Sequence, residues 1–205
     1  MPALMLVFQA EHMHDHASAM ASRPDVISLF DHHFAGVLLI LLGIIAYLEQ
    51  TRLADRHRWI RFLWPLPLLL LGTFLLVFRD RKEPWFDWLL QGMFSRTEVQ
   101  HKIFESVAIA VGLIELLRRT GQLQSRSWRQ ILNTLMLTAG IFLLFHHGHH
   151  AHIVHLEHLW MGLVAVTLSL AKIVSDQGWS GRWLGLYAVP LLFLTLGLQF
   201  ALYVE

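Results

Sequence analysis

Histidine and glutamate side chains recur at helical spacing in two apolar stretches of the sequence. Glu98, His101 and Glu105 are three and four residues apart, so an α-helix would place them on one face. His155 and His158 repeat the three-residue spacing in a later stretch. Imidazole and carboxylate groups bind Cu(II), Zn(II) or Fe(II) where several converge. The spacing therefore predicts a metal site, and Glu-x-x-His is also found in di-iron helical bundles.

Histidine is abundant, at 14 of 205 residues, and gathers near the ends of the apolar stretches. The predicted metal ligands lie at one end of the expected helices: His32, His33, Glu98, His101, Glu105, His146, His147, His155 and His158. The alternative for these residues is hydrogen bonding at a membrane interface, or nonspecific metal capture by a His-rich loop.

Three charged residues, Glu49, Glu115 and Lys172, lie near the opposite ends of the same stretches. Charges inside membrane helices usually face the bundle interior, because exposure to lipid is costly. We expect either ion pairing, with Glu115 and Lys172 as one pair, or the inner end of an ion or proton path.

The elements that must position these residues are membrane helices. Hydrophobic residues make up 55% of the chain and charged residues only 15%, where soluble domains carry roughly 25% charged residues. A bilayer-spanning helix needs about 20 mostly apolar residues. We therefore expect an all-α, polytopic membrane protein with about six transmembrane helices, at residues 31–50, 60–78, 98–117, 131–147, 155–173 and 183–204.

The chain divides into a tail and one membrane domain. Residues 1–30 form a His- and Met-containing tail or a signal remnant, and residues 31–205 form the membrane domain. A Trp-containing segment at residues 84–94 is too short to span and suits a helix lying on the membrane surface. The absence of cysteine excludes thiolate metal sites, and a net charge of +1 gives no basis for nucleic-acid binding.

Glycines recur at similar places in the expected helices. Gly72, Gly140 and Gly197 begin similar apolar sequences in the even helices, and Gly43 and Gly112 each follow a histidine by eleven residues in the odd helices. The pattern indicates three repeated helical hairpins, or only the low complexity of apolar helices.

Lysine and arginine are distributed unequally between the two sides of the predicted bundle. The loops after the first, third and fifth helices hold ten of the 16 basic residues, and the other side holds six. Cytoplasmic loops are enriched in basic residues. The bias favours a bacterial inner-membrane protein with both termini outside.

These observations together predict a bacterial inner-membrane metal-handling protein, acting in transport, capture or homeostasis. The expected ion is copper, then zinc or iron, and the expected partners are the lipid bilayer, metal ions and a periplasmic metal carrier or redox partner. One alternative is a membrane metalloenzyme, a di-iron or copper oxidase or hydroxylase, using the same His/Glu cluster. A second alternative is a b-type cytochrome with one haem b near the outer leaflet.

Overall fold

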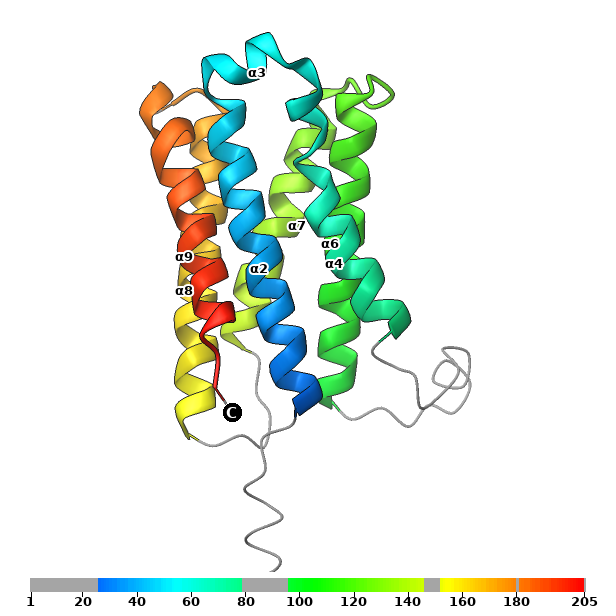
Figure 1. The fold of residues 1–205 in the computed structure, drawn as a ribbon, viewed down its shortest axis with the longest axis vertical. Helices are drawn as coiled ribbons and strands as arrows, with labels where there is room; N and C mark the ends of the chain where they lie inside the picture. The colour runs from blue at the N-terminus through cyan, green and yellow to red at the C-terminus, as the bar shows by residue number, and fades with distance from the viewer. Residues whose placement is uncertain (1–25, 79–95, 146–151, 180, 205) are drawn as a thin grey trace, which may run out of the picture.

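The computed structural model describes residues 26–78, 96–145, 152–179 and 181–204, and this part of the chain is helical without a strand. Figure 1 shows long helices running side by side. The long helices are α2 (Val26–Glu49), α4 (Pro65–Phe78), α6 (Arg96–Arg119), α7 (Arg126–Leu144), α8 (His152–Asp176) and α9 (Val189–Ala201). Short elements lie between them: α3 (Arg52–Arg56), η1 (Arg58–Phe62) and η2 (Leu184–Ala188), a π-helical turn.

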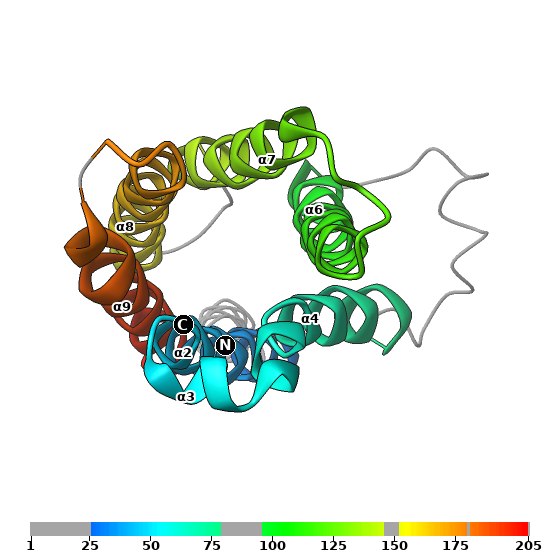
Figure 2. The same ribbon diagram turned by 90° about the horizontal axis from the view of Figure 1, so that it is seen from above.

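The long helices form a ring that follows chain order, from α2 through α4, α6, α7 and α8 to α9 (Figure 2). The pairs with the most extensive contacts are α2 with α9, α4 with α6, and α7 with α8. The first and last of these helices are therefore neighbours and close the ring. The predicted hairpins instead grouped each odd helix with the helix after it, and the repeat stays a prediction.

Glycines explain why these pairs are so close. A Cβ atom at Gly197 of α9 would lie 2.7 Å from the backbone nitrogen of Ile40 and 2.9 Å from the Gly36 carbonyl oxygen of α2. Gly72 meets the backbone of α6 in the same way, and Gly140 meets that of α8. Small residues allow helix backbones to approach within a membrane. The recurring glycines of the sequence thus lie where neighbouring helices touch.

Four helical segments are long and apolar enough to cross a membrane, among the residues that the structure describes. They are Val26–Glu49, Arg58–Val77, Ile153–Asp176 and Leu184–Ala201. The chain is a multi-pass membrane protein. The expected count of about six spans is not confirmed, because α6 and α7 carry more polar and charged residues.

The helices extend beyond the apolar segments that predicted them. α2 begins at Val26 and α7 at Arg126, each five residues before the predicted start. The polar first turn of α7 is stabilised by Ser125, whose hydroxyl accepts a hydrogen bond from the Ser127 backbone nitrogen at 3.3 Å. The predicted tail before residue 26 and the surface helix at residues 84–94 lie outside the described residues.

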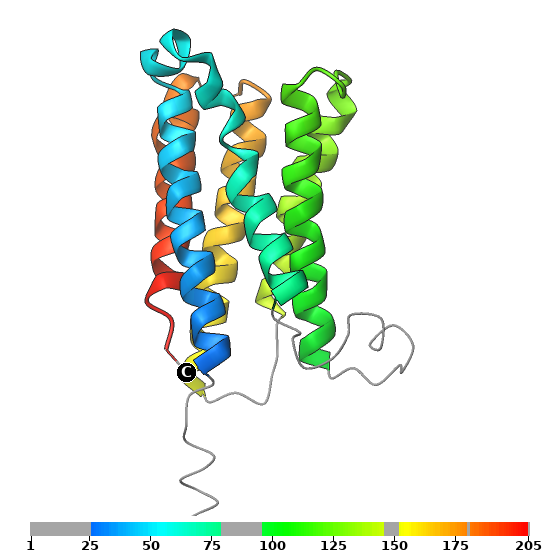
Figure 3. The same ribbon diagram turned by 45° about the vertical axis from the view of Figure 1, so that its right-hand side comes forward.

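The two ends of the bundle differ. The start of α2 and the end of α9 meet at one end, while the turns after α2, α6 and α8 lie at the other (Figures 1 and 3). We call the first the His end, after His32 and His158, and the second the Arg119 end. The loops expected to carry most basic residues are those of the Arg119 end.

Candidate functional site

A cavity of about 240 Å³ lies inside the helix ring and is lined by residues of the six long helices. Most of its lining is aliphatic or aromatic. The polar lining residues are Asp31, His32, His101, Glu105, His158 and Ser169. Ser169 donates its hydroxyl proton to the Ala165 carbonyl at 2.8 Å, which satisfies it within its own helix. The cavity therefore has an apolar body and a polar region toward the His end.

Two histidines and a tyrosine form an aromatic cluster at this end. The imidazole ring of His32 stacks on Tyr203, with 3.9 Å between ring centroids. His158 meets both rings edge-on, at 5.8 Å from His32 and 5.6 Å from Tyr203. Aromatic pairs in these geometries add stability beyond the area that they bury. The cluster thus joins α2, α8 and the segment after α9.

Backbone hydrogen bonds orient both histidines of this cluster. The Nδ1 of His32 lies 2.7 Å from the Ser28 carbonyl oxygen, and the Nδ1 of His158 lies 2.8 Å from that of Val154. A carbonyl only accepts, so each Nδ1 carries a proton. Each of the two rings is therefore held by a backbone carbonyl of its own helix.

An acidic residue from α6 adds to the polar region. Glu105 is 2% exposed, and its carboxylate pairs with the Lys102 ammonium group at 3.2 Å. The expected stripe on α6 therefore does face the interior, where a charged group avoids lipid. Asp31 of α2, which is 8% exposed, supplies a second carboxylate.

Four of the predicted ligand residues, His32, His101, Glu105 and His158, line this one cavity. Others lie elsewhere: the Nε2 of His33 is 3.1 Å from the Tyr203 carbonyl oxygen, and the side chain of His155 is exposed. The side chain of Glu98 and all of His146 and His147 lie outside the part that the structure describes.

His155 is exposed although His158, three residues later, is buried. Residues three apart on an α-helix differ by about 60° in direction, and His155 is about one turn nearer the start of α8 than His158 is. Within the described residues no group of three or more His, Asp or Glu side chains is arranged to hold a metal ion. Binding of copper, zinc, iron or haem b at these residues stays a prediction.

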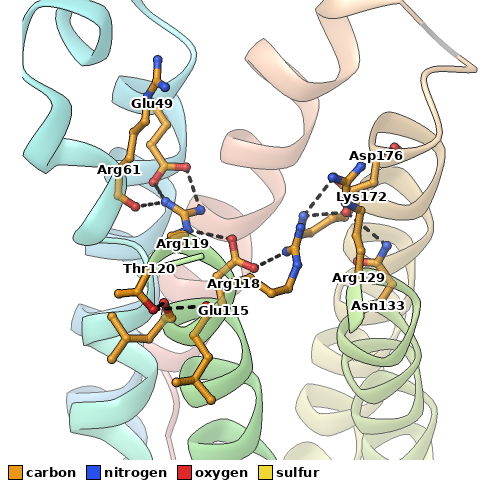
Figure 4. A network of polar contacts seen from close by, with 12 residues as sticks. Glu49, Arg61, Glu115, Arg118, Arg119, Thr120, Arg129, Asn133, Lys172 and Asp176 are labelled. Atoms are coloured by element: carbon orange, nitrogen blue, oxygen red, sulfur yellow. Dashed lines mark hydrogen bonds and ion pairs between the residues drawn. The ribbon is translucent and has the colours of Figure 1, made fainter. Parts of the chain in front are cut away.

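The Arg119 end holds a network of ion pairs (Figure 4). Arg119 of α6 pairs with Glu49 of α2 and with Glu115 one turn earlier in its own helix, at 2.7 Å for the latter. It also donates to the Arg61 carbonyl oxygen of η1. Its guanidinium carbon lies 5.6 Å from the centre of the Trp64 ring, close enough for a cation–π contact. Arg119 therefore ties three elements together.

A second group joins α7 and α8 beside the first. Lys172 pairs with Asp176 at 2.9 Å, and the Asn133 side-chain amide donates to the same carboxylate at 3.1 Å. The predicted pairing of Glu115 with Lys172 does not form, since Glu115 pairs with Arg118 and Arg119 instead. Glu115 and Lys172 each pair with residues three or four positions away on the same helix. Such pairs form without a contact to another helix.

Arg119 and Asp176 were not predicted as site residues. The spacing of four residues between Glu115 and Arg119, and between Lys172 and Asp176, is visible in the sequence. Oppositely charged residues at this spacing stabilise a helix by modest amounts. The spacing was therefore the one signal in the sequence that could have identified Arg119 and Asp176. The role of Tyr203 had no comparable indication, because it depends on the docking of α9 against α2.

The fold and the polar interior define the class of the protein: a helical, multi-pass membrane protein with a polar-ended cavity. The LiaF transmembrane domain family matches residues 34–151. This segment is more than half of the 205 residues, and the chain belongs to that family. No curated protein and no solved structure gives a significant match.

Family membership corrects the functional prediction. The match indicates a membrane protein of the LiaF stress-response regulatory type, so the prediction of metal handling is wrong. The family match gives no support to the metalloenzyme and cytochrome alternatives either. Of the expected partners the lipid bilayer is supported, while metal ions and a metal carrier or redox partner are not. The metal-handling prediction was based on residue types alone, because the sequence does not show which side chains lie close together.

Proposed function

We propose that this chain is a membrane-embedded regulator of a stress response, of the LiaF type. The observation that carries the proposal is the family match over residues 34–151, which covers most of α2 and all of α4, α6 and α7. The structure adds a physical basis for regulation. The cavity inside the ring and the network of ion pairs at the Arg119 end are built from the same helices, so a shift of α6 would alter both.

The proposal is tested by deleting the gene in its native host and comparing transcripts with those of the complemented strain. Cells are examined before and after exposure to a membrane-perturbing detergent. We expect deletion to change the basal level or the induction of a defined set of transcripts, and complementation to restore it. Unchanged transcripts under both conditions would refute the proposal. Cellular copper, zinc and iron are measured in parallel and are expected not to change.

We propose further that α6 and α7 also cross the membrane, which gives six spans. They lie in the same ring as the four apolar segments and have similar length. Several of their polar residues line the cavity, as His101 and Glu105 do, or lie at the Arg119 end, as Glu115, Arg118 and Arg119 do. Within a membrane, such residues are tolerated where they point into the bundle.

The Arg119 end is proposed to be cytoplasmic, with both termini on the outer side of a bacterial inner membrane. Ten of the 16 basic residues belong to this end. Exposed aromatic side chains also mark it, as expected at a membrane–water boundary: Trp59, Trp179, Trp183 and Tyr187.

Single cysteines test this topology, because the natural chain has none. A membrane-impermeant maleimide is applied to intact cells that carry Val26→Cys at the His end or Leu53→Cys or Gln122→Cys at the Arg119 end. We expect Val26→Cys to react in intact cells and the other two to react only after permeabilisation. Labelling of Gln122→Cys in intact cells would show that α6 and α7 do not cross, and the reverse pattern throughout would invert the orientation.

A further inference from the structure

We propose that the segment between α2 and α4, residues 51–64, binds the headgroup of an anionic phospholipid. This inference rests on the membrane embedding of the chain, and it does not rest on the proposed regulatory function or on the orientation of the bundle. It is supported by an excess of positive charge at the Arg119 end, by three exposed arginines in the segment and by the apolar side chains among them.

The Arg119 end has more positive than negative charge. Its described residues, 49–64, 115–130, 172–179 and 181–184, include ten basic and four acidic side chains, which gives a net charge of +6 with histidine neutral. All of the acidic side chains are already in ion pairs with basic residues of this end: Glu49, Asp55, Glu115 and Asp176. The excess charge therefore has no carboxylate partner within the described residues.

Three arginines of the segment carry part of this excess. Arg52 and Arg56 are four residues apart on α3 and share a face, and Arg58 follows at the start of η1. All three are exposed, and no hydrogen bond or ion pair joins their guanidinium groups to the rest of the described chain. Guanidinium groups bind phosphate oxygens through paired hydrogen bonds. A phosphate diester is therefore a suitable partner for these arginines.

The segment is anchored to the bundle, which keeps the arginines at its end (Figure 1). Ala54 and Ile60 are buried, and Trp64 belongs to the hydrophobic core. The Arg61 carbonyl oxygen of η1 accepts a hydrogen bond from Arg119. The exposed guanidinium groups are thus presented from a turn that is packed against the helices.

The neighbouring apolar residues place the segment at the boundary between membrane and water. It joins two segments that are long and apolar enough to cross a membrane, Val26–Glu49 and Arg58–Val77. The side chains of Leu53, Trp59 and Phe62 are exposed between the arginines of the sequence, and tryptophan is enriched at the level of lipid headgroups. A phospholipid offers a phosphate to the arginines and acyl chains to the apolar residues, whereas a soluble anion offers only the first.

Phosphatidylglycerol and phosphatidylcholine with identical acyl chains test the choice of headgroup. Both lipids contain a phosphate diester, and only phosphatidylcholine adds a cation, which the arginines repel. Full-length protein in nonionic detergent micelles is titrated with each lipid, and bound lipid is counted by native mass spectrometry. We expect phosphatidylglycerol to bind about tenfold tighter or more, because each basic residue near an anionic headgroup adds to the attraction. Equal binding of the two lipids would overturn the proposal.

Inorganic phosphate distinguishes a lipid site from a site for a soluble anion. It is added in excess to the complex with phosphatidylglycerol and compared with sodium chloride of equal ionic strength. We expect both salts to weaken binding to the same extent, since they screen exposed charges and neither has an acyl chain. Displacement by phosphate beyond the effect of sodium chloride would show a soluble-anion site and contradict the lipid assignment.

Matched variants locate the binding site. The segment variant replaces the three exposed arginines of the segment: Arg52→Gln, Arg56→Gln and Arg58→Gln. The control variant removes the same charge from exposed arginines of α7 and of the residues before η2: Arg126→Gln, Arg129→Gln and Arg182→Gln. Two of these control arginines already donate hydrogen bonds to groups at the end of α8, the Gln177 side chain and the Asp176 carbonyl.

We expect the segment variant to lose the preference for phosphatidylglycerol and the control variant to retain it within about threefold, because charge close to the headgroup contributes most. Circular dichroism checks that both variants keep their helices. If the segment variant does not fold, Arg58→Gln alone replaces it and is expected to weaken the preference about threefold. A preference that is unchanged in the variant of the segment, or lost equally in the control, would refute the assignment to residues 51–64.

Discussion

Replacing Arg119 by glutamine is expected to lower the free energy of unfolding by about 3 kcal/mol or more, because removal of one partner leaves buried charges uncompensated. Arg119 pairs with Glu49 and Glu115, and all three side chains are less than one-fifth exposed. Glu49 would lose the only ion pair that the described residues give it. The change is measured by denaturant titration of the protein in mixed detergent–lipid micelles.

Two matched variants separate this effect from a general loss of charge. Arg118→Gln removes a neighbouring guanidinium group that pairs with Glu115 alone, and Glu115 keeps Arg119. We expect it to cost less than about 1 kcal/mol, because Glu115 keeps one ion pair and no carboxylate is left without one among the described residues. Adding Glu49→Gln to Arg119→Gln is expected to recover part of the lost stability, because it removes the unpaired charge. Equal effects of Arg118→Gln and Arg119→Gln would contradict the central place given to Arg119.

The second large effect is expected from Gly197→Ala in α9. The added Cβ atom would meet backbone atoms of Ile40 and Gly36 at 2.7 and 2.9 Å, and backbone cannot rotate away as a side chain can. Separation of α2 from α9 should cost about 1–3 kcal/mol, the usual range for overpacking. This loss is expected even though alanine favours a helix over glycine by up to about 1 kcal/mol. The same titration measures it.

Gly185→Ala is the control for this substitution. Its added Cβ atom would meet the Ser175 hydroxyl oxygen, which a rotation of the serine side chain can move. We therefore expect little change in the unfolding free energy. If Gly197→Ala is as stable as Gly185→Ala, then α2 and α9 do not pack as closely as described.

The sequence predicts the interior faces well because they depend on a local period. Residues at three- and four-residue spacing on α6 and α8, including Glu105, Ala108 and Ser169, line the cavity as expected. Exposure of polar and charged side chains to lipid costs free energy, so such faces turn toward the bundle interior whatever their function. The sequence could not show which of His32 and His33 faces the interior. Their side chains differ by about 100° in direction on a helix, but Gly36 lies three or four residues after each of them, so both share a face with it.

The pairing of helices could not be predicted from the same spacing. A glycine shows that some backbone comes near, and it does not show which one. Gly197 suggested a repeat with Gly72 and Gly140, whereas its contact is with the first helix of the ring. The metal-handling prediction failed in a similar way, because residue types were judged before their neighbours were known. His32 stacks on Tyr203, His158 meets the same ring edge-on, and both histidines donate to their own helices.

The contact between α2 and α9 has a consequence for biosynthesis. The ribosome synthesises α2 well before α9. The surface of α2 around Gly36, which packs against α9, therefore has no partner helix until translation of the described helices is nearly finished. The family match ends at residue 151, before α8 and α9. A nascent chain stopped there would hold four of the long helices as an open arc, with the inner residues accessible to lipid or to quality-control proteases. Docking of α9 against α2 is therefore the step that closes the ring of described helices.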